Sequence, residues 1–190
     1  MSLNSTELKA LKRRYEKLEE ARRNLQKLSA DAQRLSKQAI FSLQRNDINE
    51  AQLRLTDALA QLRLGQKLTK TEMRLASEGI WRAALEEFAE AVLFFGMVTS
   101  KSFETGDLLD DPSIMLGGLS DAVGELVRLA VREATEGNAE RVEVIAKEAE
   151  RLVVFLTSMD LTGGLRSKGD QARQHLRRLE DIRYDLSRRV

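Results

Sequence analysis

The sequence predicts an all-α fold, a bundle of six to seven antiparallel helices that begins with one unusually long helix. The good helix formers Leu, Ala, Glu, Arg and Lys dominate the 190 residues, and there are only one proline and eleven glycines to interrupt them. Apolar residues recur at helical spacing along most of the chain. Because 42% of the residues are hydrophobic, a sizeable core can form, and we expect residues 1–190 to make a single helical domain.

The first helix is predicted to run from Thr6 to about Arg45, with Ser5 or Thr6 as its cap. About forty residues is long for a globular helix, so we expect part of it to pack on another subunit. The dipeptide Asn46-Asp47 ends this helix, and Asp47 is expected to cap a second helix that continues to Leu64.

The remaining elements follow from helical spacing and from the positions of glycine, asparagine and proline. In chain order we expect a connection at 65–71, a short helical piece at 72–77, a helix from Gly79 to about Lys101 and a loop at 103–112. The next helix is expected from about Ser113 to Gly137, with an irregularity at Gly117-Gly118. A helix capped by Asn138 approaches Leu161 and ends at Gly163-Gly164, and a last helix covers 165–189.

The predicted third helix combines an apolar stripe with two carboxylates. Its inward positions are Trp81, Leu85, Phe88, Val92 and Phe95. Glu87 and Glu90 lie one turn apart on the adjacent stripe, which continues through Phe94 and Met97. Carboxylates among residues that prefer burial need a partner.

A second acidic pair, Asp121 and Glu125, lies on one face of the predicted fourth helix, with Gly124 between its members. If the two helices pack side by side, four carboxylates converge, and such a cluster must be protonated or bind a hard cation such as magnesium or manganese. The spacing alone is weak evidence, since acidic pairs are common on solvated helix faces. A salt-bridge ladder from Asp121 and Glu125 to Arg128 is a specific alternative.

Composition narrows the class of protein. The absence of cysteine excludes disulfides, thiolate metal sites and a cysteine nucleophile, and it suits a reducing cytoplasm. The longest apolar run, residues 91–98, is too short to span a bilayer, and no secretory leader opens the sequence. We therefore expect a soluble, cytoplasmic protein with no membrane partner.

Charge is distributed unevenly although the net charge is only +1. Residues 1–78 and 161–190 are basic, whereas residues 79–160 hold 7 basic against 16 acidic side chains, a pattern that suits either nucleic-acid binding or self-association. The sole histidine, His175, is interpreted as part of a solvated face of the last helix, and Trp81 as a core or interface residue. The candidates for phosphate contact, each of which could equally be plain surface charge, are Arg34, Lys37, Arg45, Arg74 and Arg82.

Four ordered stretches of the chain resemble the signature motifs of the translin family. They are Ser36-Lys37 through Ile40-Phe41, Leu43 and Arg45; Leu85 through Glu87, Phe88, Glu90, Ala91 and Val92; Leu116 and Gly118 through Asp121, Gly124, Glu125, Leu126 and Arg128; and Leu179-Glu180 through Tyr184, Asp185 and Leu186.

This resemblance implies an all-helical fold and a closed, hollow octamer with active sites facing the cavity. The resemblance is to translin-associated factor X of the prokaryotic or archaeal type. In translin-associated factor X the four matching acids bind magnesium and cleave RNA, whereas translin itself lacks most of them and chiefly binds nucleic acid. Here Glu87, Glu90, Asp121 and Glu125 all match the catalytic branch. The chain departs from the family pattern at Phe88, where tyrosine is usual, and at residues 153–156.

We therefore expect a hydrolase, a metal-dependent endoribonuclease that cleaves single-stranded RNA with water activated by Mg²⁺, or by Mn²⁺, held by these four carboxylates. Single-stranded DNA is a second candidate ligand. The alternative is a noncatalytic, translin-like oligomer that binds RNA or DNA without cutting it. A plain helical scaffold with neither affinity is the third possibility.

Overall fold

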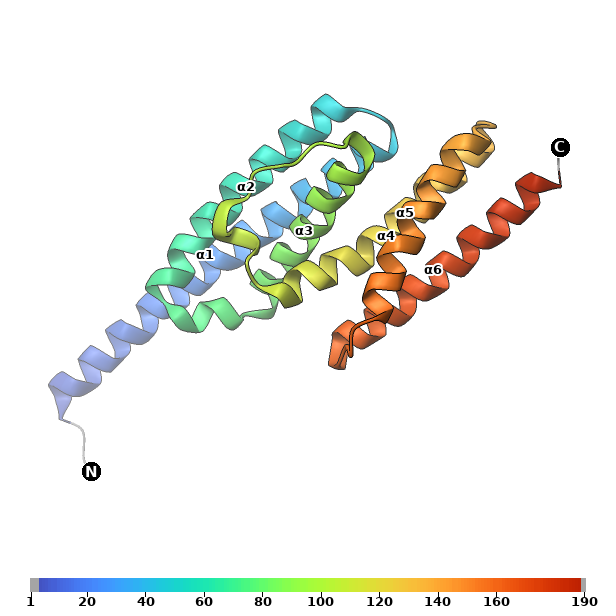
Figure 1. Cartoon of the computed structure of the whole chain (residues 1–190). Helices are drawn as coiled ribbons and strands as arrows, with labels where there is room; N and C mark the ends of the chain where they lie inside the picture. The colour runs from blue at the N-terminus through green and yellow to red at the C-terminus, as the bar shows by residue number, and fades with distance from the viewer. Residues whose placement is uncertain (1–3, 189–190) are drawn as a thin grey trace.

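The computed structural model describes residues 4–188, and within this range the chain forms six α-helices, two short 3-10 helices and no β-strand (Figure 1). The predicted all-α fold is confirmed. The elements are α1 (Ser5–Gln44), α2 (Ile48–Thr71), η1 (Met73–Ser77), α3 (Gly79–Thr99), η2 (Gly106–Leu109), α4 (Pro112–Thr135), α5 (Ala139–Thr157) and α6 (Gly163–Ser187).

The helices form two groups that meet at α3 and α4. Helices α1, α2 and α3 pack on one another, α4 packs on α5 and α6, and the contact of α3 with α4 joins the groups. Figure 1 shows α1, α2 and α3 on one side and α4, α5 and α6 on the other. A continuous apolar core runs through both groups, so α3 and α4 lie at its centre.

Helix α1 has the predicted length, 40 residues, but its cap is Asn4 and not Ser5 or Thr6. The Asn4 side chain accepts hydrogen bonds from the backbone N–H groups of Thr6 and Glu7, both at 3.0 Å, while the Glu7 carboxylate accepts from the Asn4 N–H at 2.7 Å. This reciprocal arrangement is a capping box, which satisfies N–H groups that have no partner inside the helix.

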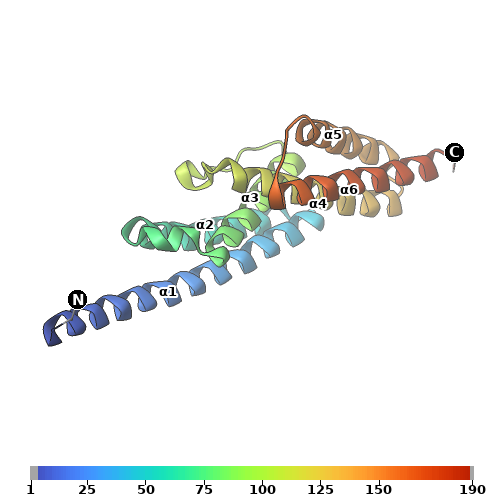
Figure 2. The same ribbon diagram turned by 90° about the horizontal axis from the view of Figure 1, so that it is seen from below.

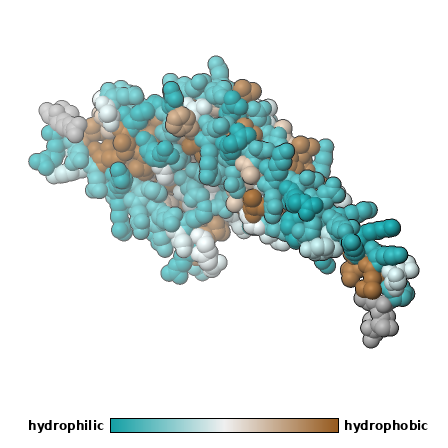
Figure 3. Space-filling model, turned by 180° about the vertical axis from the view of Figure 1, so that it is seen from behind, coloured by the Kyte–Doolittle hydropathy of each residue, from teal (hydrophilic) through white to brown (hydrophobic). Residues whose placement is uncertain are grey.

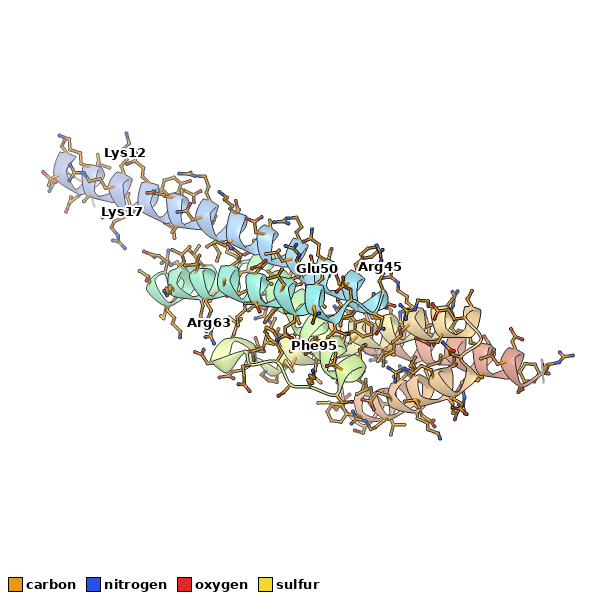
Figure 4. All side chains as sticks on the ribbon, turned by 90° about the horizontal axis from the view of Figure 1, so that it is seen from above. Lys12, Lys17, Arg45, Glu50, Arg63 and Phe95 are labelled. Atoms are coloured by element: carbon orange, nitrogen blue, oxygen red, sulfur yellow. The ribbon has the colours of Figure 1, made fainter. Side chains whose placement is uncertain are left out.

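The first half of α1 extends beyond the rest of the molecule (Figure 2). Leu8, Leu11 and Tyr15 are exposed there, at 51%, 55% and 62%, and Figure 3 shows apolar surface near this end of the molecule. Lys12 and Lys17 project from the same half (Figure 4). Burial on α1 begins at Leu25 and continues to Leu43, so the helix joins the core through its second half.

The prediction of a connection at residues 65–71 was wrong, because α2 continues to Thr71. Gly65 suggested a break, but its missing side chain makes room for the Trp81 ring: a Cβ on Gly65 would lie 2.5 Å from Trp81 Cζ3. Trp81 is accordingly a core residue, only 4% exposed. The predicted cap of α2 is confirmed, since Asp47 accepts a hydrogen bond from the Glu50 N–H at 3.1 Å.

No irregularity occurs at Gly117-Gly118, because α4 passes through both glycines as a continuous helix. These glycines instead bring α4 close to α3. A Cβ on Gly118 would lie 2.7 Å from the backbone nitrogen of Glu90, and one on Gly117 would lie 2.6 Å from the carboxyl carbon of Glu86. The close approach places the acidic residues of α3 directly beside α4.

Three further boundaries differ from the predictions. Helix α4 begins at Pro112 and is capped by Asp111, which accepts a hydrogen bond from the Ser113 N–H at 2.8 Å. The Asn138 side chain does not cap α5; it donates to the Glu133 carboxylate at 2.9 Å. Helix α5 ends at Thr157, and Gly163 begins α6 instead of ending the helix before it.

The loop between α3 and α4 is partly ordered by η2 and by contacts to α2. Arg63 donates to the Thr105 carbonyl at 2.6 Å and to the Asp107 carboxylate at 2.7 Å. The Phe103 ring packs edge-on against Phe88 and Phe95 of α3, with ring centroids 6.3 and 6.1 Å apart. Figure 4 labels Arg63 on α2 and Phe95 on α3, two of the residues that contact this loop.

None of the helices described within residues 4–188 combines the length and apolar composition needed to cross a membrane.

Candidate active site

The four predicted site acids meet where α3 packs on α4. Glu87 and Glu90 come from α3, Asp121 and Glu125 from α4, and the negative charges of the α4 acids act on both α3 carboxyls. Glu90, Asp121 and Glu125 line one cavity of about 620 Å³. The structure therefore brings together the residues that the sequence placed on two separate helices.

The Glu90 carboxyl is influenced by the negative charges of all three other acids. Burial, followed by the charges of Glu87, Asp121 and Glu125, raises the pKa of Glu90 from 4.5 to about 8, against a smaller opposing effect of the Lys168 ammonium. At neutral pH the Glu90 carboxyl accordingly holds a proton when no cation is bound.

Glu87 is held by a cation from α1. Burial raises the pKa of Glu87, and the Lys37 ammonium, 3.5 Å from its carboxylate, opposes that rise. Lys37 was predicted to contact phosphate, and in the structure it reaches an acid of the site.

Asp121 shares one ammonium with a fifth acid. Lys168 of α6 contacts both Asp121 and Glu86 of α3. Burial acts to lower the pKa of Lys168, but its hydrogen bonds to the two carboxylates outweigh that effect, so the pKa is raised and the ammonium stays charged. The sequence analysis missed both Glu86 and Lys168, because nothing in their local spacing shows that α6 will lie beside α3 and α4.

Glu125 is held on both sides of its carboxylate. Arg128 donates to it from one turn further along α4 at 2.9 Å, so part of the salt-bridge ladder considered for this helix does exist. Gln44, at the end of α1, donates to the Glu125 carboxylate and to its backbone carbonyl, both at 2.9 Å. Gln44 was not predicted as a site residue.

The donor set fits a divalent cation in its chemistry, whereas the side chains are not arranged around one. Carboxylate oxygens are the ligands that Mg²⁺ and Mn²⁺ prefer, and a divalent cation would offset the burial and the repulsion that together keep Glu90 protonated. Among residues 4–188, however, no three or more Asp, Glu or His side chains form a group that could hold a metal ion. Asp121 and Glu125 direct their oxygens at Lys168, Arg128 and Gln44 instead. Metal binding would therefore require these side chains to rotate and exchange partners.

His175 was interpreted as part of a solvated helix face, and in the structure this face borders the acidic cavity. The histidine is only partly exposed and lines the acidic cavity. Its Nε2 atom lies 3.2 Å from the point where a Cβ on Gly124 would stand. Its contact with α4 depends on how α6 packs, which the sequence of α6 alone does not show.

The other predicted phosphate contacts lie elsewhere on the molecule. Arg34 and Arg45 line a second cavity of about 540 Å³, where the Arg45 guanidinium lies 5.4 Å from the centre of the exposed Phe41 ring. Figure 4 shows Arg45 near Glu50, at the junction of α1 and α2. Arg82 pairs with Asp111 at 3.0 Å, and Arg74 is exposed on η1. Of the five predicted basic residues, Lys37 is the one that contacts a site acid.

Comparison with known structures shows that the whole chain shares its fold with solved proteins. The structure of apo-NeC3PO superposes with a TM-score of 0.86 at 24% identity and covers 98% of this chain and 100% of that one. AfC3PO gives a TM-score of 0.83 at 26% identity, and AfC3PO in complex with duplex RNA gives 0.81 at 26%; each comparison covers 95% of this chain and 96% of the other.

The sequence model of the translin family matches residues 110–190, which include α4 with Asp121 and Glu125. Over these residues, fewer than half of the chain, the sequence matches the translin family. Two of the four resembling stretches, those in α4 and α6, lie inside the matched residues, and those in α1 and α3 lie outside them. No match was found among curated proteins.

Proposed function

We propose that this chain is a member of the translin family and a magnesium-dependent endoribonuclease of the translin-associated factor X type. The observation that carries the proposal is that Glu90, Asp121 and Glu125 line one cavity at the contact of α3 with α4, where the charges of the two α4 acids also act on Glu87. Burial, followed by the charges of the neighbouring acids, raises the pKa of Glu90 to about 8. Paired carboxyls with perturbed pKa values in a cavity are typical of functional sites. The complex of AfC3PO with duplex RNA supports RNA as the class of ligand.

The four acids have defined roles in this proposal. Glu87, Glu90, Asp121 and Glu125 would hold the cation, and Glu90 would release its proton when the cation binds. A bound Mg²⁺ or Mn²⁺ would supply activation of a water molecule and neutralisation of charge on the phosphate oxygens. The Ser120 hydroxyl lines the same cavity and donates to the Leu116 carbonyl at 2.8 Å. Because the activated water would be the nucleophile, the proposal gives Ser120 no catalytic role.

The protein would act as a homo-oligomer, and a closed octamer is the assembly we propose. The exposed apolar residues Leu8, Leu11 and Tyr15, on the half of α1 that extends beyond the core, support a contact with a second copy of the chain. The absence of cysteine supports a location in the reducing cytoplasm.

A noncatalytic RNA- or DNA-binding oligomer is the second candidate, and one observation favours it. Lys168, Arg128 and Lys37 neutralise three of the acids without any metal. A protein that only binds nucleic acid could keep these ion pairs as structural contacts.

Incubation of the purified protein with labelled single-stranded RNA distinguishes the two candidates. We expect cleavage products in Mg²⁺ and none after a chelator is added, with labelled duplex RNA and single-stranded DNA tested in parallel. Binding of RNA in Mg²⁺ without cleavage would support the noncatalytic candidate.

A further inference from the structure

One stripe of α6 faces the acidic site. Lys168, Gln171, His175 and Arg178 follow one another at intervals of three, four and three residues, which places them on a single side of a helix. Lys168 contacts Asp121, and the other three line the same cavity as the acids. The cavity thus has an acidic wall on α3 and α4 and a second wall of different chemistry on α6.

The position of His175 in this wall depends on a glycine. Gly124 lies between Asp121 and Glu125 on α4, and a Cβ there would stand 3.2 Å from His175 Nε2, closer than ordinary van der Waals contact. The absence of that Cβ lets the imidazole approach the α4 backbone between the two acids.

Three members of the stripe have polar groups available for a ligand. Within residues 4–188, Gln171, His175 and Arg178 make no hydrogen bond or ion pair with another side chain or with the backbone outside the helix. Other cations of α6 are engaged: Arg173 pairs with Asp170, and Arg183 makes a two-pronged contact with Glu143 at 2.8 Å. These three groups without partners on α6 therefore all lie at the acidic cavity.

We propose that Gln171, His175 and Arg178 bind the phosphodiester backbone of an RNA strand and hold one phosphate against the acids of α3 and α4. The proposal rests on the proposed function for the identity of the ligand. A guanidinium matches the geometry of phosphate oxygens, and an imidazole N–H and an amide N–H are further donors. A phosphate that approaches carboxylates is repelled, and a cationic, hydrogen-bonding wall opposite them offsets this repulsion.

Arg178→Gln tests the wall, with Arg177→Gln as its matched control. Both arginines are exposed neighbours on α6, but only Arg178 lines the cavity. We measure binding of a short fluorescent single-stranded RNA in chelator, where cleavage cannot occur, over a range of salt concentrations. Arg178→Gln should weaken binding about tenfold and lower the magnitude of the log–log salt slope by about one, while Arg177→Gln changes neither. Equal effects of the two variants would overturn the proposal.

His175 is tested by removal and by rescue. His175→Ala should weaken RNA binding several-fold, and His175→Gln, which restores an N–H donor, should recover most of the loss. Gly124→Ala should weaken binding as His175→Ala does, because the new Cβ displaces the imidazole. A thermal melt checks that each variant folds, and if Gly124→Ala does not, the His175 pair decides. Failure of His175→Gln to recover affinity would remove the hydrogen-bonding role.

Kinetics in Mg²⁺ separate this proposal from the proposed function. If the wild-type protein cleaves RNA, Arg178→Gln should raise KM more than it lowers kcat. An unchanged KM would leave the proposed nuclease activity standing and would contradict phosphate binding by the α6 stripe. If the wild-type protein binds RNA without cleaving it, a loss of affinity in Arg178→Gln would support phosphate binding by the α6 stripe and would contradict the proposed nuclease activity. Wild-type protein with no RNA affinity would reject both.

Discussion

Replacement of Glu90 by glutamine should make the fold less sensitive to alkaline pH. Glutamine keeps the size and hydrogen-bonding groups of the side chain but cannot ionise. The pKa of Glu90 is about 8 in the folded chain against the ordinary value of 4.5, because burial and the charges of Glu87, Asp121 and Glu125 disfavour its carboxylate form.

The sign of the effect follows from proton binding. Below pH 4.5 both the folded and the unfolded states hold the proton on Glu90. Between about 4.5 and 8 the unfolded chain loses it while the folded chain keeps it, so the free energy of unfolding falls as pH rises and levels off above about 8. The gap between the two pKa values corresponds to at most about 5 kcal/mol.

Urea unfolding followed by circular dichroism, at one protein concentration with chelator present, measures this effect at pH 5 and pH 9. The wild-type chain should lose at most about 4 kcal/mol more than Glu90→Gln between these two pH values, and Mg²⁺ added at pH 9 should restore stability to the wild type but much less to the variant. Glu180→Gln, on the exposed face of α6, is the control and should behave as the wild type does. If wild type and Glu90→Gln show the same pH dependence, Glu90 is not protonated in the folded chain and the description of the site is wrong.

Three further predictions concern packing, charge and assembly. Gly118→Ala should lower the free energy of unfolding by about 1–3 kcal/mol, because its Cβ would meet the Glu90 backbone at 2.7 Å. The control Gly164→Ala, whose Cβ would meet no atom within 4 Å, should lower it far less. Equal melting temperatures of the two variants would contradict the close packing of α4 on α3. Lys168→Met removes the ammonium that Asp121 and Glu86 share, so it should lower the free energy of unfolding in chelator by about 1–2 kcal/mol. Added Mg²⁺ should recover part of this loss. A loss of stability that Mg²⁺ does not change would argue against a cation at these acids. Light scattering should report a mass near eight chains, and a monomer at micromolar concentration would remove the proposed octamer.

The sequence predicted most of what depends on periodicity. The helical class, the length of α1 and the stripe of α3 that carries Trp81 and Phe88 all follow from the spacing of apolar residues, and these positions are buried. The capping role of Asp47 likewise follows from its type and its position before a helical segment.

Glycine was the main source of error. Gly65 and Gly118 were interpreted as marks of irregular backbone, whereas both lie inside continuous helices and admit a neighbour, the Trp81 ring in one case and the Glu90 backbone in the other. A sequence shows that a side chain is missing but does not show which residue occupies the space.

The residues that pair with the proposed site acids could not be predicted from the spacing of residues along the chain. Lys168 contacts Asp121, and His175 lines the same cavity, only because α6 packs on α4. Gln44 reaches Glu125 from a position 81 residues earlier in the chain. The acids could be identified from paired carboxylates and from family resemblance. The groups that neutralise them depend on long-range packing.

The most direct test of the proposed function measures cleavage and binding of one labelled single-stranded RNA by the wild-type chain and by Glu90→Gln. We predict that the wild type cleaves in Mg²⁺ and stops in chelator, and that Glu90→Gln cleaves slower by orders of magnitude. Its RNA affinity in chelator should be retained, because the Glu90 carboxyl is protonated and uncharged there at neutral pH. Wild-type protein that binds the RNA in Mg²⁺ without cutting it, or a Glu90→Gln variant that cuts at the wild-type rate, would contradict the proposed carboxylate site.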